Sequence, residues 1–325
     1  MRIAIAGAGG FIGGWLAHEL LSQGNEVTCA DIKPLSSWHQ VHDSATNHEL
    51  DLSKLEACEK FVENADQVYN LAADMGGMGF IETHKAECML SVLINTHLLM
   101  ASRDAGVKKF FFASSACVYN ASKQDRNDID GLREEDAYPA MPEDGYGWEK
   151  LFSERMCRHF YEDYGLETRV ARYHNIYGPN GTWEGGREKA PAALSRKVAS
   201  AKINEIHQIE IWGDGEQARS FTYIDDCVEG TLRLMRSDVR EPLNIGSDEM
   251  VTINELVEIL EGVAGVKLER KYDLGAPKGV RGRNSDNTRV KQLLGWAPTV
   301  TLTEGLMKTY AWIEEQVTNS PRSSV

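Results

Sequence analysis

The sequence has no long apolar run and little positive charge. No stretch of its 325 residues approaches the roughly 18–20 consecutive apolar residues of a membrane-spanning helix, so no membrane partner is expected. Lys and Arg number 35 against 49 Asp and Glu, which gives a formal net charge of −14. Because contacts to nucleic-acid phosphates need a basic surface, a nucleic-acid partner is not expected either. An acidic protein can still bind an anionic small molecule if its basic side chains gather in a cleft.

Cysteines are few and form no C-x-x-C pair; they are Cys29, Cys58, Cys88, Cys117, Cys157 and Cys227. This scatter is typical of free thiols in a reducing compartment rather than of a disulfide framework. Met1 and Arg2 run directly into an apolar strand, without the layout of a signal peptide, so a cytoplasmic protein is expected. The histidines offer no metal-ligand spacing beyond His39-x-x-His42, and no metal site is expected.

Apolar β runs alternate with helical segments through the first half of the chain. The expected strands and helices, in chain order, are Arg2–Ala6, Phe11–Gln23 (helix), Glu26–Ala30, Gln67–Ala72, Ile94–Ala105 (helix) and Lys108–Ala113. Alternation at this spacing predicts βαβ units, and the right-handed crossover rule then favours an α/β fold with a doubly wound parallel sheet of the Rossmann type. The polar segments 36–48 and 120–136 are expected to be loops.

The alternation becomes irregular after about Arg172, which indicates a second, smaller lobe that binds the substrate. The predicted dinucleotide-binding domain spans 1–172, with a return segment near 220–245 that includes a helix at Thr222–Met235. The substrate-binding lobe is assigned to 173–219 and 246–325. The tail from Thr318 is expected to be disordered.

A glycine-rich turn, Gly7–Gly13, separates the first strand from the first helix. Glycines there permit a tight turn and let the backbone approach a pyrophosphate at the helix N-terminus. Asp31 ends the second strand 18 residues after Gly13, close to the spacing at which an acid binds the ribose 2′-hydroxyl of a dinucleotide. Because a carboxylate repels the extra phosphate of NADP, NAD is the expected cofactor. Lys33 weakens that preference, and Asp31 could instead only cap a turn.

Tyr146 and Lys150 stand four residues apart in the segment YGWEK. On a helix they share a face, so the ammonium can lie near the phenol and lower its pKa from the usual value of about 10. A phenol with a lowered pKa can act as the general base in the oxidation of an alcohol. The Y-x-x-x-K pattern is common by chance, but here it follows a dinucleotide-type turn and the pair Ser114-Ser115, which favours a redox role.

Motifs along nearly the whole chain resemble one family. GAGGFIG, SSACVY, YGWEK, RYHNIYGP and RSFTYIDD are similar to segments of the extended short-chain dehydrogenase/reductase family of nucleotide-sugar enzymes. NLAADMGGMGF, GTWEGGREKAPAA and KGVRGRNSDN are more specific, and they resemble the branch of that family that epimerises a GDP-hexose at C3 and C5. The resemblance implies a homodimeric, NAD-dependent isomerase that converts GDP-mannose to GDP-L-galactose and GDP-L-gulose.

The implied reaction oxidises C4 of the sugar with bound NAD, inverts C3 and C5, and reduces C4 again. A ketone at C4 acidifies the C–H bonds at C3 and C5, because the carbanion delocalises onto the carbonyl oxygen. Inversion then needs a base on one face and an acid on the other. In the family this pair is a Cys and a Lys, which match Cys117 and Lys189. The implied catalytic residues are Ser115, Cys117, Tyr146, Lys150 and Lys189.

The resemblance also implies two sets of binding residues. Cofactor contacts are expected at Gly7, Gly10, Phe11, Ile12, Gly13, Asp31, Asp51, Leu52, Leu71, Ala72, Ala73, Tyr146 and Lys150. Substrate contacts are expected at Gly76, Ser115, Cys117, Tyr146, Asn175, Glu188, Lys189, Lys197, Arg219 and Arg281. Arg283 is a further candidate for the diphosphate. The glycines at 76, 77 and 79 are expected to let the backbone approach the hexose, and Asn175 to bind sugar hydroxyls or to order its loop.

Other interpretations of these residues and other functions stay open. Cys117 could pack as a small hydrophobe after a strand, and Lys189 could be a solvated charge. A nucleotide-sugar 4,6-dehydratase would carry an Asp-Glu pair where Ala116 and Cys117 stand. A C4-epimerase needs no Cys–Lys pair. A binding protein of this fold without turnover usually loses the tyrosine or the lysine of the Y-x-x-x-K pair.

Overall fold

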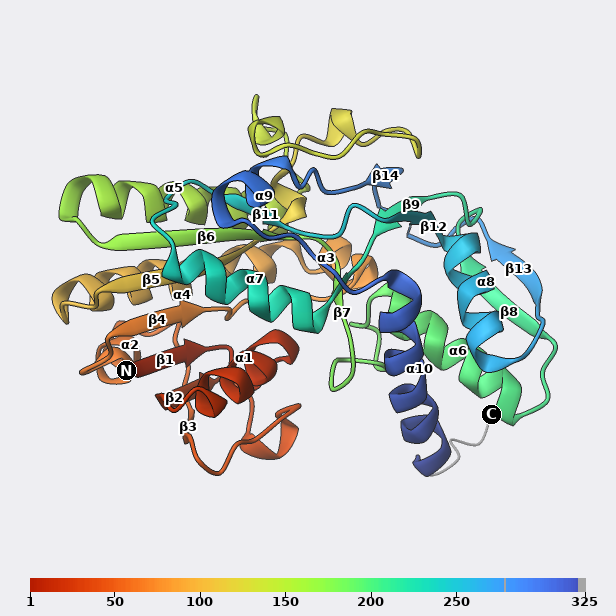
Figure 1. Cartoon of the computed structure of the whole chain (residues 1–325), viewed down its shortest axis with the longest axis horizontal. Helices are drawn as coiled ribbons and strands as arrows, with labels where there is room; N and C mark the ends of the chain where they lie inside the picture. The colour runs from red at the N-terminus through yellow and green to blue at the C-terminus, as the bar shows by residue number, and fades with distance from the viewer. Residues whose placement is uncertain (278, 321–325) are drawn as a thin grey trace.

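The computed structural model describes residues 1–277 and 279–320, and its centre is a seven-stranded parallel sheet (Figure 1). The strand order is β11-β6-β5-β4-β1-β2-β3. The bounds are β1 (Arg2–Ala6), β2 (Glu26–Asp31), β3 (Thr46–Glu49), β4 (Gln67–Asn70), β5 (Lys109–Ser115), β6 (Glu167–Tyr173) and β11 (Leu243–Ile245). The order reverses direction at β1, as in a doubly wound sheet, so the predicted Rossmann-type fold is confirmed.

Helices cover both faces of this sheet. One face carries α1 (Phe11–Ser22) and α7 (Ile224–Arg236), with α9 (Thr288–Leu294) beside β11; the other carries α2 (Leu55–Val62), α4 (Lys85–Asp104) and α5 (Tyr146–Tyr164). Successive residues of a strand point to opposite faces, so Ile3 and Ile5 join one core and Ala4 and Ala6 join the other. Burial on both faces explains why these strands are apolar almost throughout.

A second group of elements lies beyond the carboxyl ends of the strands, on the right in Figure 1. Its helices are α6 (Ala190–Ile203), α8 (Ile253–Ala264) and α10 (Leu302–Asn319). Its strands pair as β7 (Ile176–Tyr177) with β10 (Thr222–Tyr223), β9 (Ala218–Ser220) with β12 (Met250–Thr252) and β14 (Gly282–Arg283), and β8 (Gln208–Trp212) with β13 (Glu269–Asp273). Apolar residues of α6, α8 and α10 continue the core that lies under α1 and α7. The boundaries between the lobes remain a prediction.

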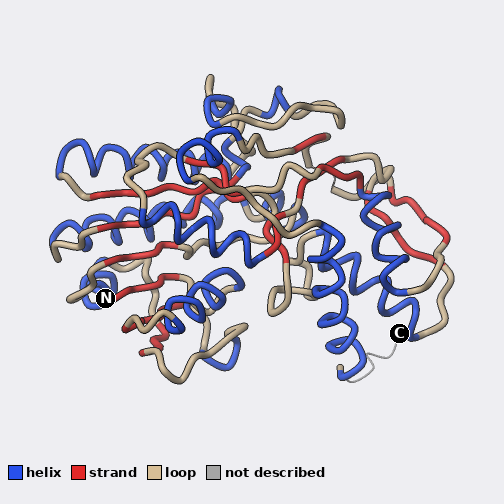
Figure 2. Tube along the Cα trace, in the orientation of Figure 1, coloured by secondary structure: helices blue, strands red, loops and turns tan. Residues whose placement is uncertain are grey.

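The segment between β5 and α5 is mostly loop and crosses the top of the sheet (Figure 2). It contains three short 3₁₀ helices, and a fourth follows β2; they are Leu35–Ser37, Ala116–Val118, Ala121–Lys123 and Glu134–Ala137. The short helix α3 (Met78–Thr83) follows β4. Among the residues that the structure describes, no helix is both long enough and apolar enough to cross a membrane.

Two expectations about secondary structure are wrong. The segment 36–48 is not all loop, because β3 begins at Thr46 and pairs in parallel with β2. β3 is a polar edge strand, so its sequence lacks the apolar pattern by which strands are recognised. The tail is not disordered from Thr318, because α10 continues to Asn319 and Ser320 caps it. The rest of that expectation falls on 321–325, which lie outside the described residues.

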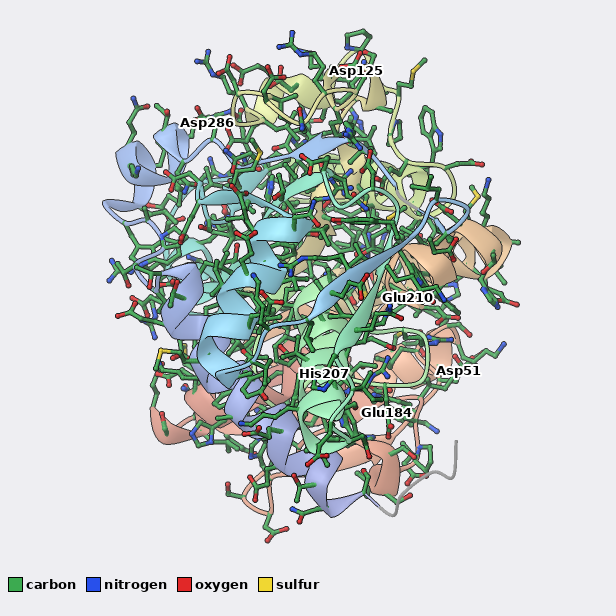
Figure 3. The ribbon with its side chains drawn as sticks, turned by 90° about the vertical axis from the view of Figure 1, so that its right-hand side faces the viewer. Asp51, Asp125, Glu184, His207, Glu210 and Asp286 are labelled. Atoms are coloured by element: carbon green, nitrogen blue, oxygen red, sulfur yellow. The ribbon has the colours of Figure 1, made fainter. Side chains whose placement is uncertain are left out.

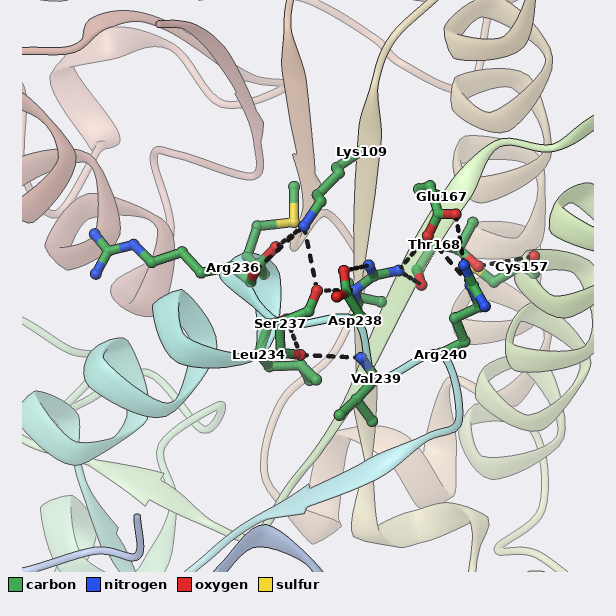
Figure 4. A network of polar contacts seen from close by, with 12 residues as sticks. Lys109, Cys157, Glu167, Thr168, Leu234, Arg236, Ser237, Asp238, Val239 and Arg240 are labelled. Atoms are coloured by element: carbon green, nitrogen blue, oxygen red, sulfur yellow. Dashed lines mark hydrogen bonds and ion pairs between the residues drawn. The ribbon is translucent and has the colours of Figure 1, made fainter. Parts of the chain in front are cut away.

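A polar network fixes α7 to the amino ends of β5 and β6 (Figure 4). Lys109 Nζ donates to the carbonyl oxygens of Met235, at 3.1 Å, and Ser237, at 3.2 Å. Arg169 Nε donates to the same Ser237 oxygen at 2.9 Å, and its Nη1 pairs with Glu167 at 3.0 Å. Cations at a helix C-terminus satisfy carbonyls that have no donor within the helix. Structural contacts therefore hold the amino ends of these strands together, and the sequence motifs cluster at the carboxyl ends.

Candidate active site

The glycine-rich turn lies at the carboxyl end of β1, against the segment that follows β4. Gly7 has a φ of +81°, and a Cβ there would meet Ala72 N at 2.8 Å. A Cβ at Gly13 would stand 2.2 Å from the Gly7 carbonyl oxygen. These positions therefore require glycine. The turn brings backbone to the N-terminus of α1, where the first N–H groups have no acceptor within the helix and suit a pyrophosphate.

Asp31 ends β2 beside this turn and is 9% exposed. Its Oδ1 accepts from Lys33 N at 3.1 Å, so the side chain also caps a turn. Lys33 Nζ donates to the Gly9 carbonyl oxygen at 2.8 Å, so that ammonium is bound by the turn itself. An acid here can accept from a ribose hydroxyl and repels a 2′-phosphate. The glycine cradle and this carboxylate together fit NAD.

The other predicted cofactor contacts from the sheet follow β3 and β4, the strands at either side of β1 and β2. Leu50 N donates to the Asp31 carbonyl oxygen at 2.9 Å, which holds the segment with Asp51 and Leu52 beside β2. Leu71 N donates to the Ala6 carbonyl oxygen at 2.9 Å and holds the segment 71–73 beside β1 in the same way. The predicted cofactor contacts therefore lie together at the carboxyl ends of these strands.

Tyr146 and Lys150 begin α5 and pack against the end of β5, where Ser115 is the last residue. Lys150 Nζ lies 5.4 Å from the centroid of the Tyr146 ring and 3.4 Å from Glu149 Oε2. Burial raises the pKa of Tyr146 well above its usual value. The expected lowering of this pKa by Lys150 is thus wrong. Desolvation of the phenol is the largest cause of the rise, and the charges of Cys117 and Glu149 add to it.

A cavity opens beyond Ser115, between the sheet and the second lobe. Nine of the ten predicted substrate contacts line it: Gly76, Ser115, Cys117, Tyr146, Asn175, Glu188, Lys189, Lys197 and Arg219. Arg281 is not among the described residues that line the cavity. Its Nη1 donates to both carboxylate oxygens of Asp214, at 2.8 and 2.9 Å. Arg283, two residues further along, lines the cavity instead.

Cys117 and Lys189 reach this cavity from segments that are far apart in the sequence. Cys117 lies in the 3₁₀ turn after β5, is 8% exposed, and donates its backbone N–H to Ser115 Oγ at 3.2 Å. Lys189 is the N-cap of α6, and both glycines of the loop before it have a positive φ, as expected of a shaped loop. Burial raises the pKa of Cys117 to about 11 and lowers that of Lys189.

The glycines after β4 allow a close contact with the loop that carries Lys189. A Cβ at Gly77 would meet the Glu188 carbonyl oxygen at 2.5 Å, and Gly77 N donates to the Arg187 carbonyl oxygen at 3.0 Å. Their contact with a hexose remains a prediction. Asn175 Nδ2 donates to the Ser220 carbonyl oxygen at 3.0 Å, so this side chain orders its own loop as well as lining the cavity.

Two guanidinium groups line the cavity from paired strands, one of them buried (Arg283) and the other half-buried (Arg219). Arg219 on β9 and Arg283 on β14 occupy paired positions. Burial, together with the positive charge of Arg283, lowers the pKa of Arg219 to about 9. The planar fork of Arg matches phosphate oxygens. Lys197 adds a third cation to the lining, with Nζ donating to the Glu210 carbonyl oxygen at 2.9 Å.

Several residues that line the cavity or contact its lining were not predicted from the sequence. Glu210, labelled in Figure 3, and Trp212 lie on β8 and line the cavity. The alternation I-E-I-W could have indicated that they share one face of a strand. Glu143 binds Arg283 through a 2.7 Å hydrogen bond, and Gln124 binds it through another of 2.7 Å. Nothing local marks these two, because the residue that they contact lies 140 residues beyond Glu143 and 159 residues beyond Gln124.

A doubly wound sheet with a glycine cradle, an acid on β2 and a Ser–Tyr–Lys set defines a dehydrogenase-type site. The chain belongs to the NAD dependent epimerase/dehydratase family, which it matches over residues 3–246, and its cofactor is NAD. Among its relatives is GDP-mannose 3,5-epimerase 1 of Oryza sativa subsp. indica, 51% identical over 320 residues, which are 98% of this chain and 82% of that protein. The GDP-mannose 3,5-epimerase of Arabidopsis thaliana is 49% identical over 98% of this chain and 83% of its own length. Among solved structures, the UDP-glucose 4-epimerase of Thermotoga maritima with UDP-glucose has a TM-score of 0.88 and 27% identity, over 98% of this chain and 100% of that one.

Proposed function

We propose that this chain converts GDP-mannose to GDP-L-galactose and GDP-L-gulose by inversion at C3 and C5. The observation that carries the proposal is that Cys117 and Lys189 line the same cavity as Ser115 and Tyr146. A C4-epimerase needs only the Ser–Tyr–Lys set. Inversion at C3 or C5 removes a proton from one face and adds one at the other, and therefore needs a further acid and base. The relatives that are about half identical are named for this substrate and these two carbons, which supports the same assignment.

The first group of side chains acts at C4. When bound, NAD supplies a positively charged ring and the reversible oxidation of the sugar at C4. Ser115 would hold the reacting oxygen, and Tyr146 would take the hydroxyl proton and later return it. Because burial keeps Tyr146 a neutral phenol at rest, the step depends on positive charge close to the ring, to which Lys150 contributes at 5.4 Å.

The second group acts at C3 and C5. The ketone at C4 acidifies both C–H bonds, and each inversion removes a proton from one face and adds one at the other. Cys117 and Lys189 would carry these protons. Burial favours the neutral form of each group, because it raises the pKa of the thiol and lowers that of the amine. A neutral thiol can give a proton, and a neutral amine can accept one.

The cations of the cavity support a diphosphate ligand. We propose that Arg219 and Lys197 bind the diphosphate of the GDP-sugar, while Asn175 and Glu188 contact the hexose. The diphosphate roles expected for Arg281 and Arg283 from the sequence are weaker, because Asp214 already binds the first guanidinium and Glu143 the second. The cofactor contacts expected from the sequence stay as proposed, with Asp31 at the ribose.

Product analysis tests this function against its nearest alternative. Purified protein is incubated with GDP-mannose, and the hexoses are released by mild acid and separated by chromatography against standards. Galactose and gulose are the expected products. Talose, the C4 epimer of mannose, would show a C4-epimerase and overturn the proposal.

We also propose that the protein is a homodimer formed through α4 and α5. These helices pack against each other and leave large apolar side chains exposed, namely Met89, Leu90, Leu93, Trp148 and Phe152. A second copy would bury this patch. Sedimentation should give twice the chain mass of 36.2 kDa, and the double variant Leu90→Asp/Phe152→Asp should give a monomer. A monomer in the unsubstituted protein would contradict the proposal.

The six cysteines support a cytoplasmic location. All six are free and buried, which fits a compartment that keeps thiols reduced. Fractionation of the source cells should recover the protein with cytoplasmic markers. Recovery with a secreted or membrane fraction would contradict this proposal.

A further inference from the structure

A buried ion pair lies behind the Cys117 thiol. Arg283 Nη1 is 3.5 Å from Cys117 Sγ, and Arg283 Nη2 donates to Glu143 Oε1 at 2.7 Å. The side chains of Arg283 and Glu143 are 5% and 11% exposed. Glu143 N donates to the Cys117 carbonyl oxygen at 3.0 Å, so the carboxylate and the thiol come from adjacent segments. The proposed reaction leaves Glu143 without a role.

The guanidinium is held in one orientation. Its Nε donates to Gln124 Oε1 at 2.7 Å. The Gln124 amide is itself oriented, because its Nε2 donates to the Tyr119 carbonyl oxygen at 3.2 Å. The three nitrogens of the Arg283 guanidinium group therefore have different neighbours: Nε binds Gln124, Nη2 binds Glu143, and Nη1 lies near the Cys117 sulfur. Glu143 Oε2 is buried and accepts no N–H or O–H hydrogen bond from the described residues, and the thiol acts on this carboxyl as a weak donor.

The thiol sits among charged and titratable groups from several elements. Those that face it are Glu143, Tyr146, Lys189, Arg219 and Arg283. Three cations would favour the loss of its proton, and one carboxylate opposes them. Burial raises the pKa of Cys117, the Glu143 charge raises it further, and Arg283 lowers it. Burial also acts to raise the pKa of Glu143, but Arg283, the Cys117 thiol and Arg219 together hold that pKa below its usual value, so the carboxylate is charged.

We propose that Glu143 is a positioning residue for Cys117, which binds Arg283, holds the guanidinium against the thiol and balances its charge. Cys117 then keeps its proton in the resting enzyme and enters the reaction as a thiol. Without the carboxylate, an unbalanced guanidinium 3.5 Å from the sulfur would stabilise the thiolate. The link to catalysis rests on the function proposed above for Cys117. The charge balance itself does not.

The test is the pH dependence of Cys117 alkylation in the full chain, without substrate. Iodoacetamide reacts with the thiolate, and mass spectrometry of the Cys117 peptide gives the rate at each pH. In Glu143→Gln the charge is lost at nearly constant shape, so the pKa of Cys117 should fall by at least about one unit, equal to roughly tenfold faster alkylation at pH 8. Glu143→Asp keeps the charge and should stay within about threefold of the unsubstituted protein.

Two controls separate charge balance from loosened packing. Glu135→Gln makes the same chemical change at an exposed acid and should leave the rate unchanged. A loosened fold would speed the five other cysteines and leave the pH dependence of Cys117 as it was. The proposal fails if Glu143→Gln keeps the original pH dependence, or if Glu143→Asp behaves like Glu143→Gln. It also fails if the unsubstituted Cys117 already reacts as a thiolate at pH 7. Because alkylation needs no turnover, these results stand whether or not the proposed function does.

Discussion

The cofactor end and the substrate end of the site are built by different means. At the cofactor end the chain offers mainly backbone, with the turn Gly7–Gly13 and the N-terminus of α1, together with the carboxylate of Asp31. At the substrate end it offers side chains from the sheet, from α5 and α6, and from small strands of the second lobe. The cofactor end depends on glycines, because a side chain at these positions would collide with neighbouring backbone. The substrate end depends on the charge and protonation state of side chains that the fold brings together. Substitutions should therefore act on the two regions in different ways.

The largest effect is expected where the two regions meet. Tyr146→Phe removes the hydroxyl that moves the C4 proton, so turnover should fall by about 10³-fold or more and no transient NADH absorbance at 340 nm should form. Tyr164→Phe, at the exposed end of the same helix, is the matched control and should keep both. Normal NADH formation in Tyr146→Phe would remove Tyr146 from this role.

A somewhat smaller effect is expected at the substrate end alone. Cys117→Ser and Lys189→Ala should each reduce C3 and C5 inversion by roughly 10²–10³-fold, because each removes one proton carrier. Both variants should still contain NAD and still form NADH with GDP-mannose, since the C4 machinery is intact. Product formation and absorbance at 340 nm measure the two steps separately. Full epimerisation by Cys117→Ser would show that another group carries the proton.

At the cofactor end, one added methyl group should be enough to weaken NAD binding. In Gly13→Ala the new Cβ would stand 2.2 Å from the Gly7 oxygen, so the turn must shift and the protein should purify with much less NAD. Gly262→Ala is the matched control, because it also lies in a helix but its Cβ meets nothing within 4 Å. That variant should keep its NAD and gain about 0.5–1 kcal/mol of stability. Unchanged NAD content in Gly13→Ala would contradict the cradle.

The same comparison explains what the sequence could and could not reveal. The cofactor end was predictable because a turn of seven residues and an acid 18 residues later carry the signal within one βαβ unit. Cys117 and Lys189 were found only through family motifs, since no local rule relates a residue after β5 to a loop before α6. Glu143 and Gln124 were missed because their role appears only when β14 brings Arg283 between them. The pKa of Tyr146 was misjudged because the sequence shows a nearby charge but not the depth of burial.

The smallest effect concerns stability beneath the cavity. His174 follows β6, is buried, and its Nε2 lies 3.0 Å from Asn244 Oδ1. Burial lowers its pKa from 6.5 to about 3. Below pH 6.5 the imidazole therefore binds a proton in the unfolded chain but not in the folded chain. The contribution of His174 to the free energy of unfolding is complete above pH 6.5. It is lost as the pH falls toward 3, by up to about 1.4 kcal/mol per pH unit. Urea unfolding from pH 7.5 to 4.5 should show a shallower loss for His174→Gln. An unchanged slope would contradict the assignment.

The central claim is that one cavity supports both C4 redox chemistry and inversion at C3 and C5. Its most direct test is proton NMR of GDP-mannose with the purified, NAD-containing protein in heavy water. The account predicts loss of the C3 and C5 proton signals together with new galactose- and gulose-configured products. Retention of both signals, with NAD confirmed in the protein, would contradict it.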